Sequence, residues 1–100
     1  MDKDDLKKAI QAAQEMQADL VKAQMQLMHE EIKGHSNDHK VLVLMNGHGD
    51  FKSIKISPDL LAEGLNSVEH GVLQAIKDAT EKAAALTRER LASVSQKIGL

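Results

Sequence analysis

The stretch from Lys40 to Pro58 reads KVLVLMNGHGDFKSIKISP, and it predicts a β-hairpin in the middle of the chain. Two short apolar runs, Val41–Met45 and Phe51–Ile56, flank the tetrapeptide Asn46–Gly49. Because an Asn-Gly pair tolerates the positive φ angles of tight hairpin turns, we expect the two runs to be antiparallel strands. The hairpin ends at Ser57, a favoured N-cap residue, and the proline after it suits the first position of a helix.

Both faces of the first predicted strand are apolar, because five consecutive aliphatic side chains occupy Val41–Met45. Side chains alternate between the two faces of a strand, so each face of this one needs a cover. An isolated two-stranded hairpin is marginal in water. We therefore expect Glu31-Ile32-Lys33 to add a third strand, followed by a turn over residues 36–38, although the same residues also fit the end of a preceding helix.

A long helix is predicted before the hairpin. Apolar residues recur there at steps of three and four, the spacing with which a helix buries one face; they are Leu6, Ala9, Ala13, Met16, Leu20, Ala23 and Leu27. A second stripe predicts that the later half of this helix is buried on two sides, and it consists of Val21, Met25, Met28 and Ile32.

A second long helix is predicted after the hairpin. One helical turn is expected over Asp59–Glu63 before Gly64 interrupts it, and Asn66 with Glu69 three residues later has the pattern of a capping box. The apolar face of the long helix comprises Leu65, Val68, Val72, Ile76, Ala79, Ala83 and Leu86. Glycine weakens a helix interior, so Gly71 predicts a close contact with a neighbouring element.

These patterns predict an α+β fold: an α-β-β-β-α subunit with a three-stranded antiparallel sheet between two long helices. A chain of 100 residues makes one domain, which we expect to span residues 1–100. Phe51 is the single aromatic residue, so the core is built from aliphatic side chains. That core is thin for helices of this length, and we therefore expect a homodimer in which a second subunit completes the burial.

Composition also predicts the compartment. The chain has no cysteine, and hence neither a disulfide framework nor a thiolate site. No apolar run approaches the ~20 residues of a membrane span. The segment Met1–Asp5 is acidic and polar, where a signal peptide is basic and then apolar. We therefore expect a cytoplasmic protein with no membrane partner.

Candidate catalytic and metal-binding residues form no recognised pattern. Zinc can be held by imidazole and carboxylate, but His35, Asp38 and His39 lie in polar turns, without an i, i+4 pair of ligands on a helix. The segment Asn46–Gly49 joins two strands, whereas a phosphate-binding loop leads into a helix. The serines have no nucleophile-elbow setting. We expect no enzyme activity, no metal, no cofactor and no small-molecule substrate.

Binding of a macromolecule is the remaining class of function, and duplex DNA suits the composition best. The chain has no Trp and no Tyr, which argues against stacking on unpaired bases, whereas Lys and Arg suffice to grip duplex phosphates. The net charge is −2, but the segment 84–100 is locally basic. If the two long helices lie antiparallel, the start of the first meets the end of the second and unites Lys3, Lys7, Lys8, Arg88, Arg90 and Lys97. Exposed solubilising charges are an equally good interpretation of these residues.

An ordered set of short segments resembles the YbaB/EbfC family of bacterial nucleoid-associated proteins. The resemblance runs from about Ala13 to Ser95 and depends on the order and spacing of the segments, since no one of them is diagnostic. They are AQEMQ at 13–17, EIKG at 31–34, VLVLMNG at 41–47, IKISPDLL at 54–61, AIKDA at 75–79 and LASVS at 91–95.

The resemblance implies a homodimer joined through its sheet region, whose helices project as the arms of tweezers and bind double-stranded DNA of the nucleoid with little sequence preference. In that family the ends of the projecting helices are implicated in DNA contact, and by position these are Lys3, Lys7, Lys8, Arg88, Arg90 and Lys97. The alternative function is a protein–protein interaction module, in which the dimer groove receives another protein and Met16, Met25 and Met28 supply an adaptable apolar contact.

Overall fold

The computed structural model describes the backbone of residues 3–97 and the side chains of residues 3–94. Six elements follow one another, namely α1 (Lys3–His29), β1 (Ile32–His35), β2 (Val41–Met45), β3 (Phe51–Ile56), α2 (Pro58–Glu63) and α3 (Leu65–Lys97). The strands form one antiparallel sheet in the order β1-β2-β3. The predicted α-β-β-β-α layout is confirmed, and both hairpin strands have the predicted bounds.

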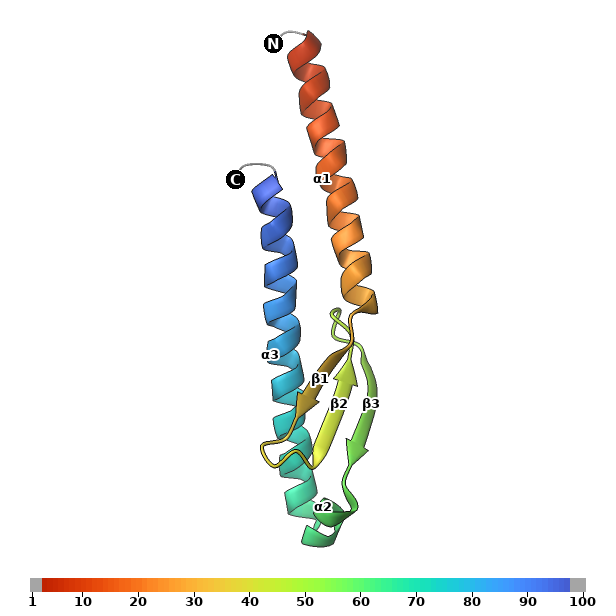
Figure 1. Cartoon of the computed structure of the whole chain (residues 1–100), viewed down its shortest axis with the longest axis vertical. Helices are drawn as coiled ribbons and strands as arrows, with labels where there is room; N and C mark the ends of the chain where they lie inside the picture. The colour runs from red at the N-terminus through yellow and green to blue at the C-terminus, as the bar shows by residue number, and fades with distance from the viewer. Residues whose placement is uncertain (1–2, 98–100) are drawn as a thin grey trace.

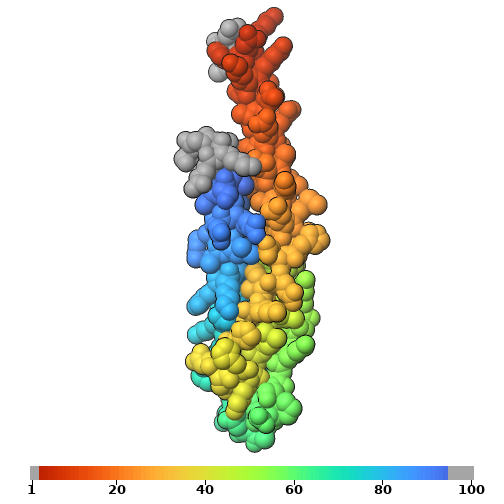
Figure 2. Space-filling model, in the orientation of Figure 1, coloured from red at the N-terminus to blue at the C-terminus, as the bar shows by residue number. Residues whose placement is uncertain are grey.

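The molecule is long and narrow because α1 and the sheet follow one another along α3. Figure 1 shows α3 running behind the sheet and then beside the lower part of α1, while the first turns of α1 stand beyond the end of α3. The same overhang is visible in the space-filling view (Figure 2). The principal extents are 72 × 20 × 14 Å.

The core lies between α3 and one face of the sheet. The side chains of Val41 and Val43 are fully buried there, as are Ala75 and Ala79 of α3. α3 packs on β1 and β2, and β3 lies beside this contact. Hence Phe51 and Ile54 on β3 remain 50% and 48% exposed.

Close packing of α3 on the sheet requires glycine at two positions. A Cβ atom on Gly34 would lie 2.3 Å from the carbonyl oxygen of Ala75. A Cβ atom on Gly71 would lie 3.0 Å from Val41 Cγ2 and 3.1 Å from Leu60 Cδ2. The close contact predicted at Gly71 is therefore confirmed.

Side chains of α3 also cover the free edge of β1. The backbone N–H of His35 donates to Asp78 Oδ2 at 2.9 Å, and Lys82 Nζ donates both to the carbonyl oxygen of Lys33 at 3.0 Å and to Asp78 Oδ2 at 2.9 Å. The His35 N–H, followed by Lys82, lowers the pKa of the Asp78 carboxyl below its ordinary value. An edge strand protected in this way is a poor template for pairing with another chain.

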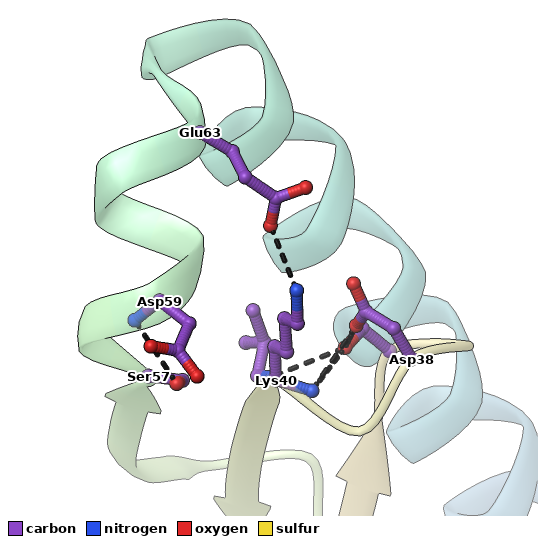
Figure 3. A network of polar contacts seen from close by, with 7 residues as sticks. Asp38, Lys40, Ser57, Asp59 and Glu63 are labelled. Carbon is purple, nitrogen blue, oxygen red and sulfur yellow. Dashed lines mark hydrogen bonds and ion pairs between the residues drawn. The ribbon is translucent and has the colours of Figure 1, made fainter.

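A polar network joins the β1–β2 turn to α2 at the end of the sheet that is far from α1 (Figure 3). Ser36 Oγ donates to Asp38 Oδ1 at 2.7 Å and accepts from the backbone N–H of Lys40 at 3.1 Å. The Ser36 hydroxyl, followed by the Lys40 N–H that donates to Asp38 Oδ1 at 3.1 Å, lowers the pKa of Asp38 below its ordinary value. Lys40 Nζ reaches Glu63 of α2 at 2.9 Å, which raises the pKa of Lys40.

The cap at the start of α2 is confirmed, but the cap predicted for α3 is wrong. Ser57 Oγ accepts from the backbone N–H of Asp59 at 3.3 Å, as expected of an N-cap residue. α3, however, begins at Leu65, and the Val68 N–H donates to the Gly64 carbonyl, so Asn66 lies inside the first turn. Gly64, with φ of 108°, ends α2 and leads directly into α3, which leaves no room for a separate cap at Asn66.

The prediction that the later half of α1 is buried on two sides is also wrong within one chain. Val21, Met25 and Met28 are 48%, 55% and 47% exposed. Ala23 and Leu27 are the buried residues of this helix. The reason is geometric: α1 has α3 on one side, and the sheet lies below it and not against its second stripe.

Candidate nucleic-acid interface

The tip of α1 carries three exposed lysines, Lys3, Lys7 and Lys8. Asp4 and Asp5 share the first turn, where acidic side chains stabilise the positive end of the helix dipole. Within the part of the chain that the structure describes, the three ammonium groups form no hydrogen bond or ion pair. They are therefore available to an anionic partner.

The two arginines near the end of α3 differ in their surroundings. Arg88 is exposed, and its guanidinium has no partner among the described residues. Arg90 instead forms an ion pair through Nη2 with Glu30 Oε1, and its Nη1 lies 3.5 Å from Gln26 Oε1. The side chains of Arg90 and Glu30 are 34% and 36% exposed. The side chain of Lys97 lies outside the described residues.

The structure does not bring the two predicted basic clusters together. Arg90 lies level with Gln26 of α1. Because an α-helix rises about 1.5 Å per residue, the step from Lys8 to Gln26 corresponds to about 27 Å along α1. The reason is that the first half of α3 lies along the sheet, so that its last turns reach only the lower part of α1.

The β2–β3 turn holds the base of α1, a role that the sequence patterns did not predict. The Gly47 N–H donates to the carbonyl oxygen of Leu27 at 2.8 Å, and His48 Nε2 lies 2.7 Å from the carbonyl oxygen of Gln24. Thr87 Oγ1 of α3 lies 3.5 Å from the Gly47 carbonyl oxygen. The turn thus joins both long helices and sets the direction in which α1 leaves the sheet.

A groove runs between α1 and α3 above this joint. Its lining includes a further basic residue, Lys22, which is exposed and which sequence reasoning did not single out. The groove is lined by Asp19, Lys22, Ala23, Gln26, Arg90, Ser93 and Val94. Lys22 follows the apolar stripe of α1 without a local basic run, so no pattern in the sequence marked it.

The surface of the molecule on the far side from α3 is apolar in two places. Leu42 and Leu44 lie on the sheet face that α3 does not cover, and both are half-buried. A shallow apolar depression on α1 is lined by Gln14, Gln17, Ala18, Val21, Lys22 and Met25. Both faces of β2 are apolar, as predicted, and within one chain the second face has no helix over it.

The histidines of the β1–β2 turn do not gather into a metal site. The rings of His35 and His39 lie 5.2 Å apart, but Asp38 accepts hydrogen bonds from Ser36 and Lys40. Among residues 3–94 no group of three or more potential metal ligands is found.

In the described region, no helix is long and apolar enough to span a bilayer.

Comparison with known proteins adds sequence and structural relatives. A model of the YbaB/EbfC DNA-binding family matches residues 2–98. A nucleoid-associated protein of Thermosynechococcus vestitus is 38% identical over 87 residues, which cover 87% of this chain and 76% of that protein. A nucleoid-associated protein of Cyanothece sp. is 36% identical over 96 residues, which cover 96% of this chain and 84% of that protein.

A solved structure shares the fold. The crystal structure of an uncharacterized protein from Helicobacter pylori matches with a TM-score of 0.69 and 19% sequence identity, and the match covers 99% of both chains. The α-β-β-β-α layout thus occurs in a protein whose sequence differs at most positions.

Proposed function

The chain belongs to the YbaB/EbfC DNA-binding family, and we propose that it is a nucleoid-associated protein of the cytoplasm that binds double-stranded DNA. The resemblance that the sequence segments indicated is thereby confirmed. The names of the relatives describe nucleoid-associated proteins and not enzymes, which supports a binding function.

The observation that carries the proposal is the pair of projecting helices with exposed cations along them. Lys3, Lys7 and Lys8 stand at the free tip of α1, and Arg88 is exposed on the last turns of α3. Phosphate contacts need cationic side chains that are not already paired. Because the three lysines lie about 27 Å or more along α1 from the level of Gln26 and Arg90, we propose that these cations follow the DNA backbone and that base sequence has little influence on affinity.

We further propose that the DNA-binding form is a homodimer joined on the sheet side of the molecule. Leu42 and Leu44 face away from α3 with no cover in one chain. Burying such a patch against a second copy would stabilise both subunits, at roughly 25 cal/mol per Å² of apolar surface. Two copies would present two pairs of helices to one duplex.

The test is the binding of fluorescently labelled duplexes of unrelated sequence, followed by anisotropy over a series of salt concentrations. If the dimer neutralises about four to six phosphates, log Kd changes with log salt with a slope of about 4 to 5, and the duplexes differ little in affinity. Replacing Arg88 by Gln weakens all of them similarly and lowers the slope.

The matched control is Lys77→Gln, which removes one exposed cation from the same helix at its sheet end. This variant is expected to bind like the wild type. The triple variant Lys3→Gln, Lys7→Gln, Lys8→Gln tests the tip of α1 separately. Equal losses for Arg88→Gln and Lys77→Gln would mean that net charge matters and the assigned positions do not.

A second candidate function, binding of another protein, is favoured by the exposure of Met16, Met25 and Met28 on α1. Methionine side chains adapt to varied apolar surfaces. The same anisotropy series separates the two functions. An absence of duplex binding at the lowest salt concentration would refute the DNA proposal and leave the apolar side of α1 as the functional surface.

A further inference from the structure

Arg88 and Arg90 lie two residues apart near the end of α3, yet among the described residues Arg88 has no partner whereas Arg90 forms an ion pair. The guanidinium of Arg90 is held by the Glu30 carboxylate through Nη2, with Gln26 Oε1 at 3.5 Å from Nη1. Glu30 lies between the end of α1 and the start of β1, so this ion pair ties the base of one arm to the shaft of the other. We call the contact among Arg90, Glu30 and Gln26 the arm clasp.

We propose that Glu30 is an intramolecular competitor for DNA phosphate at Arg90, so that this arginine contacts DNA only when the arm clasp opens. The inference rests on the proposed function, because it assigns a regulating residue to the same interface. It predicts that Arg88 can bind phosphate without breaking a polar contact among the described residues, whereas Arg90 must first give up its ion pair with Glu30.

The chemistry of the two anions supports the competition. A carboxylate and a phosphate both accept hydrogen bonds from the flat, forked face of a guanidinium, so both suit the same donor atoms of Arg90. The pair is about one-third exposed on each side, which leaves Arg90 reachable from solvent. Partly exposed ion pairs are weak, and an incoming phosphate can therefore displace the carboxylate.

The position of the clasp adds a mechanical consequence. Above it the lining of the groove between the helices includes Lys22, Ala23 and Val94. When Arg90 turns from Glu30 to a phosphate, α1 keeps its contacts with the β2–β3 turn through Gly47 and His48 but loses its ion pair to α3. DNA binding and the spacing of the two arms are thus coupled at this point.

The test compares Glu30→Gln with Glu31→Gln in the duplex-binding assay at low salt. Glu31 is the adjacent acid, is exposed, and has no ion pair among the described residues, so both variants lose the same charge at nearly the same place. We expect Glu30→Gln to bind about two- to fivefold more tightly than Glu31→Gln, the range that corresponds to a partly exposed ion pair. It should also have the steeper salt dependence, since Arg90 then meets phosphate unpaired.

A double variant shows whether the gain acts through Arg90. In a chain that also carries Arg90→Gln, the change Glu30→Gln should raise the duplex affinity no more than the change Glu31→Gln does. Equal affinities of the two single variants, or a gain that survives Arg90→Gln, would overturn the competition while leaving DNA binding itself intact. A wild-type chain that binds no duplex at low salt would instead overturn the proposed function, and the inference with it. Thermal unfolding of each variant checks that it is folded.

Discussion

Gly34 has no side chain to separate β1 from α3, and a Cβ there would lie 2.3 Å from the carbonyl oxygen of Ala75 and 2.6 Å from the Cβ of Ala79. The contact is therefore made by backbone against backbone, with alanines on the helix side. A contact of this kind cannot relax by turning a side chain. Single methyl groups at this level decide whether α3 and the sheet fit together.

Replacing Gly34 by Ala is expected to destabilise the protein by about 3 kcal/mol, the upper part of the range for overpacked cores. The added Cβ would lie 2.3 Å from a backbone oxygen and 2.6 Å from the backbone nitrogen of Ala79, so α3 must move. The free energy of unfolding in urea measures the effect.

The matched substitution is Gly71→Ala, on α3 itself. There the added Cβ would meet the ends of the Val41 and Leu60 side chains at 3.0 and 3.1 Å, and alanine favours the helix by about 1 kcal/mol. We expect its free energy of unfolding to stay within about 1 kcal/mol of the wild type. Similar losses at Gly34 and Gly71 would contradict the distinction between backbone and side-chain obstacles.

At the scale of elements, Asp78 and Lys82 attach α3 to the edge of β1. The pKa of Asp78 is lowered in the folded chain, so its charge stabilises the fold above the unfolded-state value of about 3.8. This contribution is lost as the pH falls through the lowered pKa. The charged acceptor, discounted for its exposure, is expected to stabilise the fold by about 1 kcal/mol.

Asp78→Asn keeps the shape and a neutral acceptor while removing the charge. We expect it to be less stable than the wild type at pH 7, with the difference shrinking as the pH falls below about 3.8. Urea unfolding at pH 7 and pH 3 measures both differences. Glu81→Gln, an exposed acid one turn away, serves as the control. A difference that stays constant between the two pH values would show that the charge of Asp78 does not hold β1.

The elements with strong local signals were predictable, and those set by neighbours were not. The hairpin strands have the predicted bounds, but the turn between them differs from the predicted one: the positive φ lies at Gly49, and Asn46 Oδ1 accepts from the backbone N–H groups of His48 and Asp50. The exposure of Ile54 follows from the position of α3, which packs on β1 and β2, and the alternation along β3 does not reveal this. The capping-box pattern at Asn66 gave a wrong prediction because Gly64 both ends α2 and accepts, through its carbonyl oxygen, from the Val68 N–H in the first turn of α3.

The candidate site was predictable as a set of residue types but not as an arrangement. Lys3, Lys7, Lys8 and Arg88 are exposed, as a DNA-contacting role requires. The pairing of Arg90 with Glu30 depends on how far α3 runs beside α1, and that follows from the length of α3 taken up by the sheet. From the sequence we expected the start of the first long helix to lie beside the end of the second, and the structure does not have this arrangement.

For the molecule as a whole, the proposed homodimer predicts the effect of a charge on the uncovered sheet face. Leu44→Glu places a carboxylate there, opposite Lys33 and Ser53 in the sheet register, without entering the core against α3. We expect the variant to remain folded but to have the mass of one chain by light scattering, because burying a carboxylate at an apolar interface costs several kcal/mol in lost hydration, even with Lys33 opposite it.

Thr80→Glu on the exposed side of α3 is the matched control and should have the same mass as the wild type, twice that of one chain. If Leu44→Glu also remains dimeric, the subunits meet elsewhere, and the exposed stripe of α1 with Val21 and Met25 is the next surface to test.

The overhanging helix also governs how the protein moves through solvent. The radius of gyration of one chain is 20.1 Å, whereas a compact chain of this length has about 13 Å. Friction grows with the longest dimension, so one chain should sediment slowly and leave a sizing column at the volume of a much heavier spherical protein. Its tumbling should be anisotropic, with faster rotation about the axis of the helices than end over end.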